Sequence, residues 1–147
     1  MIEQQSLQLA WPTGWQDYEL LDSGNQQRLE RFGRFLLARP DPHALWEPRL
    51  SKKRWYKADA RFEQKKGQAE QGFWVAEQPL PEQWVISYGQ LRFYARLTPF
   101  RHTGIFPEQA ANWEWCANLI KQRKKGARAE FVCLYGHRKP IGRRRWG

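Results

Sequence analysis

The sequence predicts an α+β fold, in which a mostly antiparallel β region at residues 1–100 precedes one long helix and one buried strand. Three patterns lead to this prediction. Short segments with apolar residues at alternate positions, separated by turn residues, fill residues 18–97. Apolar residues three and four positions apart mark a helix over residues 107–125. Residues 131–135 are a continuous apolar run, as a buried parallel strand requires.

The first part of the β region is divided by strong turn signals. We expect an antiparallel meander of strands over residues 18–21, 28–32 and 34–38. The first strand ends at Asp22-Ser23-Gly24-Asn25, whose residue types are those that turns prefer, and Gly33 separates the second strand from the third. Pro40 ends the meander, and we expect a short helix from His43 to Trp46.

The second part of the β region contains an irregular basic stretch and a hairpin. Residues 47–68 combine Lys and Arg with aromatic residues, and we interpret them as a loop with one strand. A short strand is expected at residues 73–76. Two further strands at residues 84–87 and 91–97 are joined at Tyr88-Gly89-Gln90, which predicts a hairpin.

The clearest element is the helix over residues 107–125. Proline suits the first helical position, so Pro107 marks the start, and Glu108 suits the positive end of the helix dipole. The apolar stripe consists of Ala110, Trp113, Cys116, Ala117, Leu119 and Ile120. Basic residues fill the last turn, and Gly126 stops the helix.

Size and composition favour a folded protein in a reducing compartment. The chain has 147 residues, of which 41% are hydrophobic, enough for one compact domain with its own core. No apolar segment is typical of a signal peptide or a membrane span. Cys116 and Cys133 lie far apart and neither belongs to a CxxC pair, so we expect no disulfide framework and no metal. A cytoplasmic location fits these features best.

The net charge of +10 is concentrated at one end of the chain. Residues 121–147 contain ten Lys or Arg and one acid, a net charge of +9, which leaves +1 for residues 1–120. A basic segment of this kind binds polyanions without specificity and with strong salt dependence. The overall charge is therefore evidence about the final segment rather than about the body of the chain.

One group of residues in the body combines the chemistry that single-stranded nucleic acids require. Basic side chains attract phosphates, and aromatic side chains stack on bases. The candidate contacts are Lys52, Lys53, Arg54, Trp55 and Tyr56. A solvated basic loop is the alternative interpretation. Most of the nine tryptophans are expected to be core residues, because large aromatics dominate burial in small domains.

Five segments resemble the opening of a known enzyme family. They are Tyr18–Asn25, Leu29–Gly33, Arg39–Pro40, Trp84–Gly89 and Arg96–Trp113. Residues 15–136 are similar to the amino-terminal part of bacterial class I S-adenosylmethionine (SAM)-dependent methyltransferases, related to the ribosomal RNA (rRNA) cytosine methyltransferases that modify carbon 5. The resemblance implies a β-rich domain at residues 1–100 and the start of a methyltransferase domain at residues 101–136. Residues 131–135 would be the first strand of an incomplete Rossmann-like sheet.

The resemblance also implies a candidate pocket. The rRNA enzymes carry Thr-Gly, a few apolar residues, Asp-Gln and then Asn in a passage that lies against the methyltransferase domain. The corresponding candidate pocket-lining residues are His102, Thr103, Gly104, Glu108, Gln109 and Asn112. A structural loop is the alternative for the turn at residues 102–104, and the helix dipole already explains Glu108. Ala110 and Trp113 stand where the rRNA enzymes carry arginines, which puts an RNA contact at these two positions in doubt.

Relatives would use SAM, held by a glycine-containing turn after the first sheet strand. Residues 131–136 match that strand and its exit, but residues 137–147 depart into a basic tail. We therefore expect a chain truncated or frame-shifted after Gly136, without SAM binding and without catalytic residues. Codons for His137–Arg143 can also encode Thr-Gly-Ser-Pro-Ser-Val in a neighbouring frame, and the DNA sequence would test this explanation.

Three functions are compatible with these patterns. The first is an inactive fragment of a methyltransferase that acts on RNA in its full-length relatives. The second is a small basic RNA-binding module without catalysis. The third is an inert remnant that self-associates through an exposed C-terminal strand, since an unpaired strand edge can pair with another chain.

Overall fold

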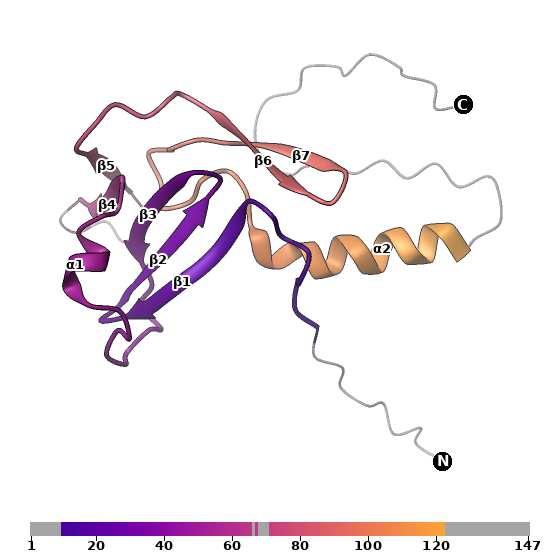
Figure 1. Cartoon of the computed structure of the whole chain (residues 1–147), viewed down its shortest axis with the longest axis horizontal. Helices are drawn as coiled ribbons and strands as arrows, with labels where there is room; N and C mark the ends of the chain where they lie inside the picture. The colour runs from indigo at the N-terminus through magenta and orange to yellow at the C-terminus, as the bar shows by residue number, and fades with distance from the viewer. Residues whose placement is uncertain (1–9, 66, 68–70, 123–147) are drawn as a thin grey trace.

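The computed structural model describes residues 10–65, 67 and 71–122, and Figure 1 shows how their elements are arranged. A five-stranded sheet lies at one end, next to a short helix. A separate two-stranded hairpin and a longer helix extend from it. The α+β class predicted from the sequence is confirmed in this respect. The predicted strand at residues 131–135, the tail at residues 137–147 and any self-association through them lie outside the described residues.

The larger sheet has the strand order β1-β2-β3-β4-β5. Its strands are β1 (Tyr18–Gly24), β2 (Gln27–Phe32), β3 (Phe35–Pro40), β4 (Ala60–Gln64) and β5 (Gly72–Ala76). Neighbours are antiparallel except β3 and β4, which pair in parallel through Leu37 and Ala60. A parallel pair needs a crossover connection, and residues 41–59 provide it. This connection carries helix α1 (Lys52–Trp55), within a stretch that the sequence predicted to be irregular.

The turn between β1 and β2 lies further along the chain than predicted. Residues 22–24 continue β1, and the turn is made by Asn25 and Gln26, whose φ angles of 49° and 59° are left-handed. Their backbone N–H groups donate to the carbonyl oxygens of Trp46 and Ala44, at 2.8 and 2.7 Å. The crossover therefore supports a turn conformation that non-glycine residues seldom adopt.

The short helix predicted from His43 to Trp46 is wrong, because this segment contains no helix. The carbonyl groups of Ala44 and Trp46 point at the β1–β2 turn and accept its hydrogen bonds. The indole N–H of Trp46 donates to the carbonyl oxygen of Ser23 at 2.9 Å. Contacts with the sheet thus replace the local bonds of a helix.

The predicted hairpin is confirmed as β6 (Trp84–Tyr88) and β7 (Leu91–Ala95). It packs on the larger sheet through one apolar core that contains Phe32, Leu37 and Ile86. The indole N–H of Trp84 donates to the carbonyl oxygen of Phe32 at 3.0 Å, which links the hairpin to the end of β2.

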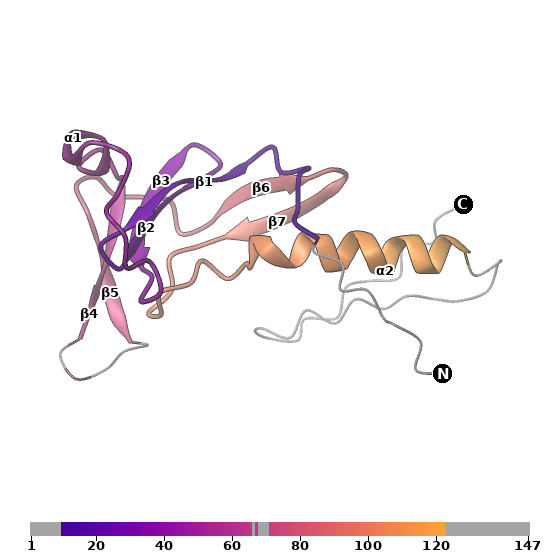
Figure 2. The same cartoon turned by 90° about the horizontal axis from the view of Figure 1, so that it is seen from below.

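The long helix begins later than predicted. Residues Pro107–Gln109 form a single 3-10 turn, and α2 runs over Ala110–Gln122. α2 lies alongside the hairpin in Figures 1 and 2 and points away from the larger sheet. The ring of Trp113 contacts Phe93 and Trp15, with centroid separations of 5.0 and 6.1 Å.

The predicted domain boundary at residue 100 falls within a continuous core. Ile105 is buried in the same cluster as Phe32 and Ile86, and Trp113 packs against that cluster. The start of the predicted methyltransferase domain is thus packed directly on the β region. Within the described residues, no helix has both the length and the apolar character needed to cross a membrane.

Candidate functional site

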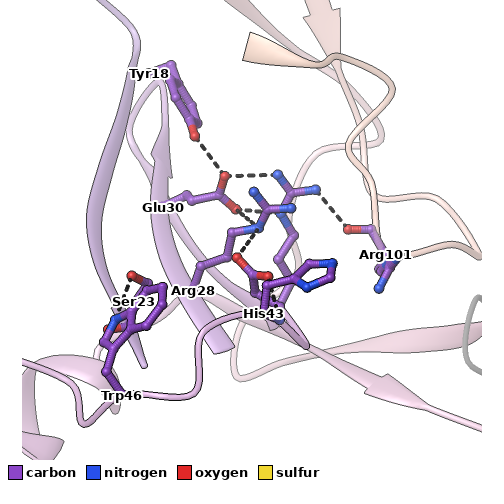
Figure 3. Close-up of polar contacts among 9 residues, drawn as sticks. Tyr18, Ser23, Arg28, Glu30, His43, Trp46 and Arg101 are labelled. Carbon is purple, nitrogen blue, oxygen red and sulfur yellow. Dashed lines mark hydrogen bonds and ion pairs between the residues drawn. The ribbon is translucent and has the colours of Figure 1, made fainter. Parts of the chain in front are cut away.

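A buried polar cluster lies on β1, β2 and β3, and Figure 3 shows its members pointing toward one another. The carboxylate of Glu30 is fully buried. Its Oε1 atom accepts hydrogen bonds from the Tyr18 hydroxyl at 2.8 Å and from Nη2 of Arg39 at 2.9 Å, and its Oε2 atom accepts from Nε of Arg39. Nε of Arg28 lies 3.8 Å from Oε2 of Glu30 and 3.9 Å from Oδ2 of Asp41.

The pKa shifts in this cluster favour fixed protonation states. Burial, together with the negative charge of Glu30 and the hydrogen bond to it, raises the pKa of Tyr18, so its hydroxyl remains a donor. Burial opposes the charged form of Arg39, but bonding to Glu30 outweighs it and raises the pKa of the guanidinium. Both oxygens of Glu30 are occupied. The cluster is therefore suited to holding the strands in register and not to proton transfer.

Arg39 also connects the sheet to the turn that contains the predicted pocket residues. Its Nη1 atom donates to the carbonyl oxygen of Arg101 at 3.1 Å. The Thr98 hydroxyl lies 2.7 Å from the carbonyl oxygen of His102, and the N–H of Arg96 donates to the carbonyl oxygen of Thr103 at 3.1 Å. These backbone contacts fix the path of residues 96–104.

The predicted pocket residues are divided between the core and the surface. Thr103 is fully buried, whereas Gly104, with a left-handed φ of 82°, is exposed and faces open space. The ring of His102 stacks on Phe100 at 5.6 Å and contacts Phe106 at 5.8 Å.

The remaining three predicted pocket residues follow the turn. Glu108, Gln109 and Asn112 are all exposed. The amide of Asn112 donates to Oε1 of Gln109 at 2.8 Å, so these two side chains bind each other on the surface. Thr103 thus lies in the core, whereas Glu108, Gln109 and Asn112 lie at the surface.

The predicted nucleic-acid contacts are brought together on α1, but with one exception. Lys52, Lys53, Arg54 and Tyr56 are exposed, and the Tyr56 side chain is 69% exposed. Trp55 instead points into a second small core, and its indole N–H donates to Oδ2 of Asp22 at 2.9 Å. Trp55 is therefore an anchor for α1 and not a surface for stacking.

Asp22 on β1 forms hydrogen bonds to the crossover at residues 41–59. Besides Trp55, its carboxylate accepts the backbone N–H groups of Arg49 at 3.2 Å and Leu50 at 2.8 Å. Burial alone would raise the pKa of Asp22, but these hydrogen bonds outweigh it and lower the pKa. The Asp22 side chain thus attaches the short basic helix α1 to the sheet.

We define the α1 surface as the exposed side chains of Lys52, Lys53, Arg54, Tyr56 and Lys57. Arg61 on β4 lies next to it, with its guanidinium carbon 5.6 Å from the centroid of the Tyr56 ring. Within the described residues, the four cations of the α1 surface form no ion pair. Their charge remains available to an anionic ligand.

A depression of about 140 Å³ adjoins the α1 surface. It is lined by Phe35, Tyr56, Lys57, Ala58, Asp59, Glu77, Gln78, Pro79 and Leu80. The sequence does not predict this depression, because its lining comes from β3, the end of the crossover and the β5–β6 connection. No local motif contains these three segments. The parallel β3–β4 pairing brings them together, and no sequence pattern predicts that pairing.

Comparison with known proteins finds a similarity among solved structures. No family model and no curated protein matches the chain. A solved structure, described as the SAM-dependent methyltransferase from Agrobacterium tumefaciens, matches with 36% sequence identity and a TM-score of 0.71. The match covers 78% of this chain and 36% of that protein. The chain is thus similar, in sequence and in fold, to part of a SAM-dependent methyltransferase, and it spans little more than a third of that protein's length.

Proposed function

We propose that this chain is the substrate-binding part of a SAM-dependent methyltransferase and that it binds single-stranded RNA through the α1 surface. The observation that carries the proposal is a group of four exposed cations, next in sequence to the exposed Tyr56, that form no ion pair within the described residues. Proteins that bind single strands combine a positive surface for the phosphates with aromatic rings for the bases.

The attachment of α1 to the sheet supports this function. Trp55 is buried and hydrogen-bonded to Asp22, which fixes the helix on β1. Because α1 is fixed to the sheet, its cations lose less conformational entropy when they bind a ligand. Preorganisation of this kind favours affinity. In the proposal, the exposed Tyr56 contacts the ligand, and the adjacent Trp55 attaches the helix to the sheet.

The methyltransferase resemblance supports RNA as the substrate class. The segments at residues 18–25, 84–89 and 96–113 resemble enzymes related to the rRNA cytosine methyltransferases. In the proposal, SAM serves the whole protein, and the residues described here contribute RNA binding. The residues at 102–112 lead into the start of α2.

RNA binding is tested by fluorescence anisotropy of a labelled single-stranded oligoribonucleotide over a range of salt concentrations. The test variant is the triple substitution Lys52→Ser, Lys53→Ser and Arg54→Ser. Each phosphate contact contributes about 0.7 to the slope of log affinity against log salt for single strands, so we expect the slope to fall by about 2. The matched control replaces three exposed cations elsewhere, Lys65, Arg92 and Arg96, with Ser.

A deletion of residues 137–147 separates the α1 surface from the basic end of the chain. We expect weaker overall binding in the deletion variant, but the same effect of the triple substitution on its slope. If the deletion alone abolishes binding, or if the α1 triple and the control triple behave alike, the α1 surface is not the RNA site.

A further inference from the structure

Resting on the proposed RNA-binding function, we propose that the bound RNA continues from the α1 surface onto β4 and β5, where the ring of Phe73 stacks on a further base. The β4–β5 face consists of two directly opposed pairs, Arg61 with Val75 and Glu63 with Phe73. Phe73 and Val75 are 49% and 43% exposed, so the exposed apolar area on this face is contiguous rather than scattered. Contiguous exposed apolar area is typical of a binding surface.

The β4–β5 face points away from the main core. Trp74 packs against that core, and its ring centroid lies 5.3 Å from that of the buried Phe62. Successive side chains of a strand point to opposite faces of the sheet. Phe73 and Val75, on either side of Trp74 in the sequence, therefore lie on the opposite face. Exposed aromatic rings on a sheet face are one means by which proteins stack the bases of single-stranded RNA.

The same side of the sheet carries α1. Arg61 is paired with Ala38 on β3, and paired residues of neighbouring strands share a face. Ala38 belongs to the second small core together with Leu29 and Trp55, so α1 covers this face over β2 and β3. The part of the face over β4 and β5 is left exposed, and Figure 2 shows both strands extending beyond α1. The α1 surface and the β4–β5 face are thus neighbours on one side of the sheet.

Arg61 connects the two surfaces. Its guanidinium carbon lies 5.6 Å from the centroid of the Tyr56 ring, and its Nη2 atom donates to the carbonyl oxygen of Trp55. Val75 lies directly opposite Arg61, and Phe73 follows about 7 Å further along β5. Within the described residues Arg61 forms no ion pair. Its charge is therefore available to a phosphate between a base on Tyr56 and a base on Phe73.

The charges on this side of the sheet favour a polyanion over an apolar protein partner. Arg61 adds a fifth cation to the four of the α1 surface. Glu63 is the only acid among the four residues of the β4–β5 face, and it is exposed opposite Phe73. A carboxylate at this position repels phosphates and lowers the affinity for RNA, so its removal has a predictable sign. Contact between apolar surfaces through Phe73 and Val75 would show no such dependence on charge and salt.

The test measures the affinity of the full chain for a single-stranded oligoribonucleotide of about eight nucleotides, by anisotropy at one fixed salt concentration. Phe73→Leu keeps an apolar side chain but removes the ring, and we expect roughly tenfold weaker binding, the loss for one stacked base. Phe73→Tyr keeps the ring and is expected to bind within about twofold of the wild type. Tyr94 on β7 is 66% exposed and distant from β4 and β5 in Figures 1 and 2, so Tyr94→Leu is the matched control and leaves the affinity unchanged.

A second pair of variants tests the charge of the β4–β5 face. Glu63→Gln is expected to strengthen RNA binding by about threefold at low salt and by less at high salt, because salt screens the repulsion. Glu82→Gln removes the same charge from an exposed position outside the face and is expected to leave the affinity unchanged.

Three results would overturn the second stacking site while leaving the proposed function intact. They are wild-type affinity in Phe73→Leu, a loss in Phe73→Tyr as large as in Phe73→Leu, and equal affinities of Glu63→Gln and Glu82→Gln. Urea denaturation checks that the variants remain folded, which we expect because the Phe73 side chain is about half exposed. Absence of salt-dependent RNA binding by the wild type overturns both the second stacking site and the proposed function.

Discussion

Charged residues serve different purposes in the β1–β5 sheet and on the short helix α1. On β2 and β3, Glu30 and Arg39 are buried and bind each other, and Tyr18 completes the set. On α1, the cations are exposed and have no acidic partner within the described residues. A charge that is already paired maintains the structure, whereas a charge that lacks a partner is available for binding.

The largest expected effect comes from breaking the buried pair. Arg39→Met keeps the side-chain volume but leaves the Glu30 carboxylate buried next to an apolar group. Removal of one partner from a buried ion pair typically costs about 3–5 kcal/mol of unfolding free energy. Urea denaturation measures the loss.

The exposed pair of Glu19 and Arg31 provides the control for that experiment. Nε of Arg31 lies 3.4 Å from Oε2 of Glu19, and the Glu19 side chain is 57% exposed. Glu19→Gln is expected to cost less than about 1 kcal/mol, because exposed pairs are weak. Equal losses in Arg39→Met and Glu19→Gln would show that the buried cluster has no special structural role.

A second effect separates the adjacent aromatic residues of α1. Trp55→Phe keeps most of the buried ring but removes its hydrogen bond to the Asp22 carboxylate, and a hydrogen bond to a charged group contributes about 1.5–3 kcal/mol to the unfolding free energy. Tyr56→Ala changes an exposed side chain and is expected to alter the unfolding free energy by no more than about 0.5 kcal/mol. If Tyr56→Ala is the more destabilising of the two, the assignment of anchor and ligand contact is reversed.

The smallest expected effect is a pH dependence that originates at Asp22. Its pKa in the folded chain is lower than its ordinary value of 3.8, so folding favours the ionised carboxylate. The resulting stability is present above the unfolded pKa of 3.8 and is lost as the pH falls through the folded value. Urea midpoints below pH 4 should therefore decline more steeply in the wild type than in Asp22→Asn, and parallel curves would contradict this role of Asp22.

Local patterns in the sequence predicted the elements whose shape depends on neighbouring residues. Alternating residues gave β2 and the β6–β7 hairpin, and the apolar stripe gave α2. The start of α2 was predicted three residues early, because Pro107 and Glu108 belong to a 3-10 turn in which the same residue types are favourable. Element ends depend on finer geometry than a pattern of residue types contains.

Features that depend on contacts far apart in the chain were not predictable. Asp22 has the residue type of a turn, but its carboxylate accepts hydrogen bonds from Arg49, Leu50 and Trp55, and β1 continues through it. α1 is a single turn, too short for a periodic pattern, and its Trp55 could not be assigned to the core before Asp22 was known as its partner. The depression at Asp59 and Glu77 depends in the same way on the parallel pairing of β3 and β4.

Hydrogen–deuterium exchange of the full chain, with and without single-stranded RNA, tests the central claim most directly. The account predicts that RNA protects the amides of residues 49–59 and leaves those of the hairpin at residues 84–95 unchanged, because the exposed cations and the exposed Tyr56 ring lie at residues 52–57. Protection confined to residues 123–147, with no change at residues 49–59, would contradict it.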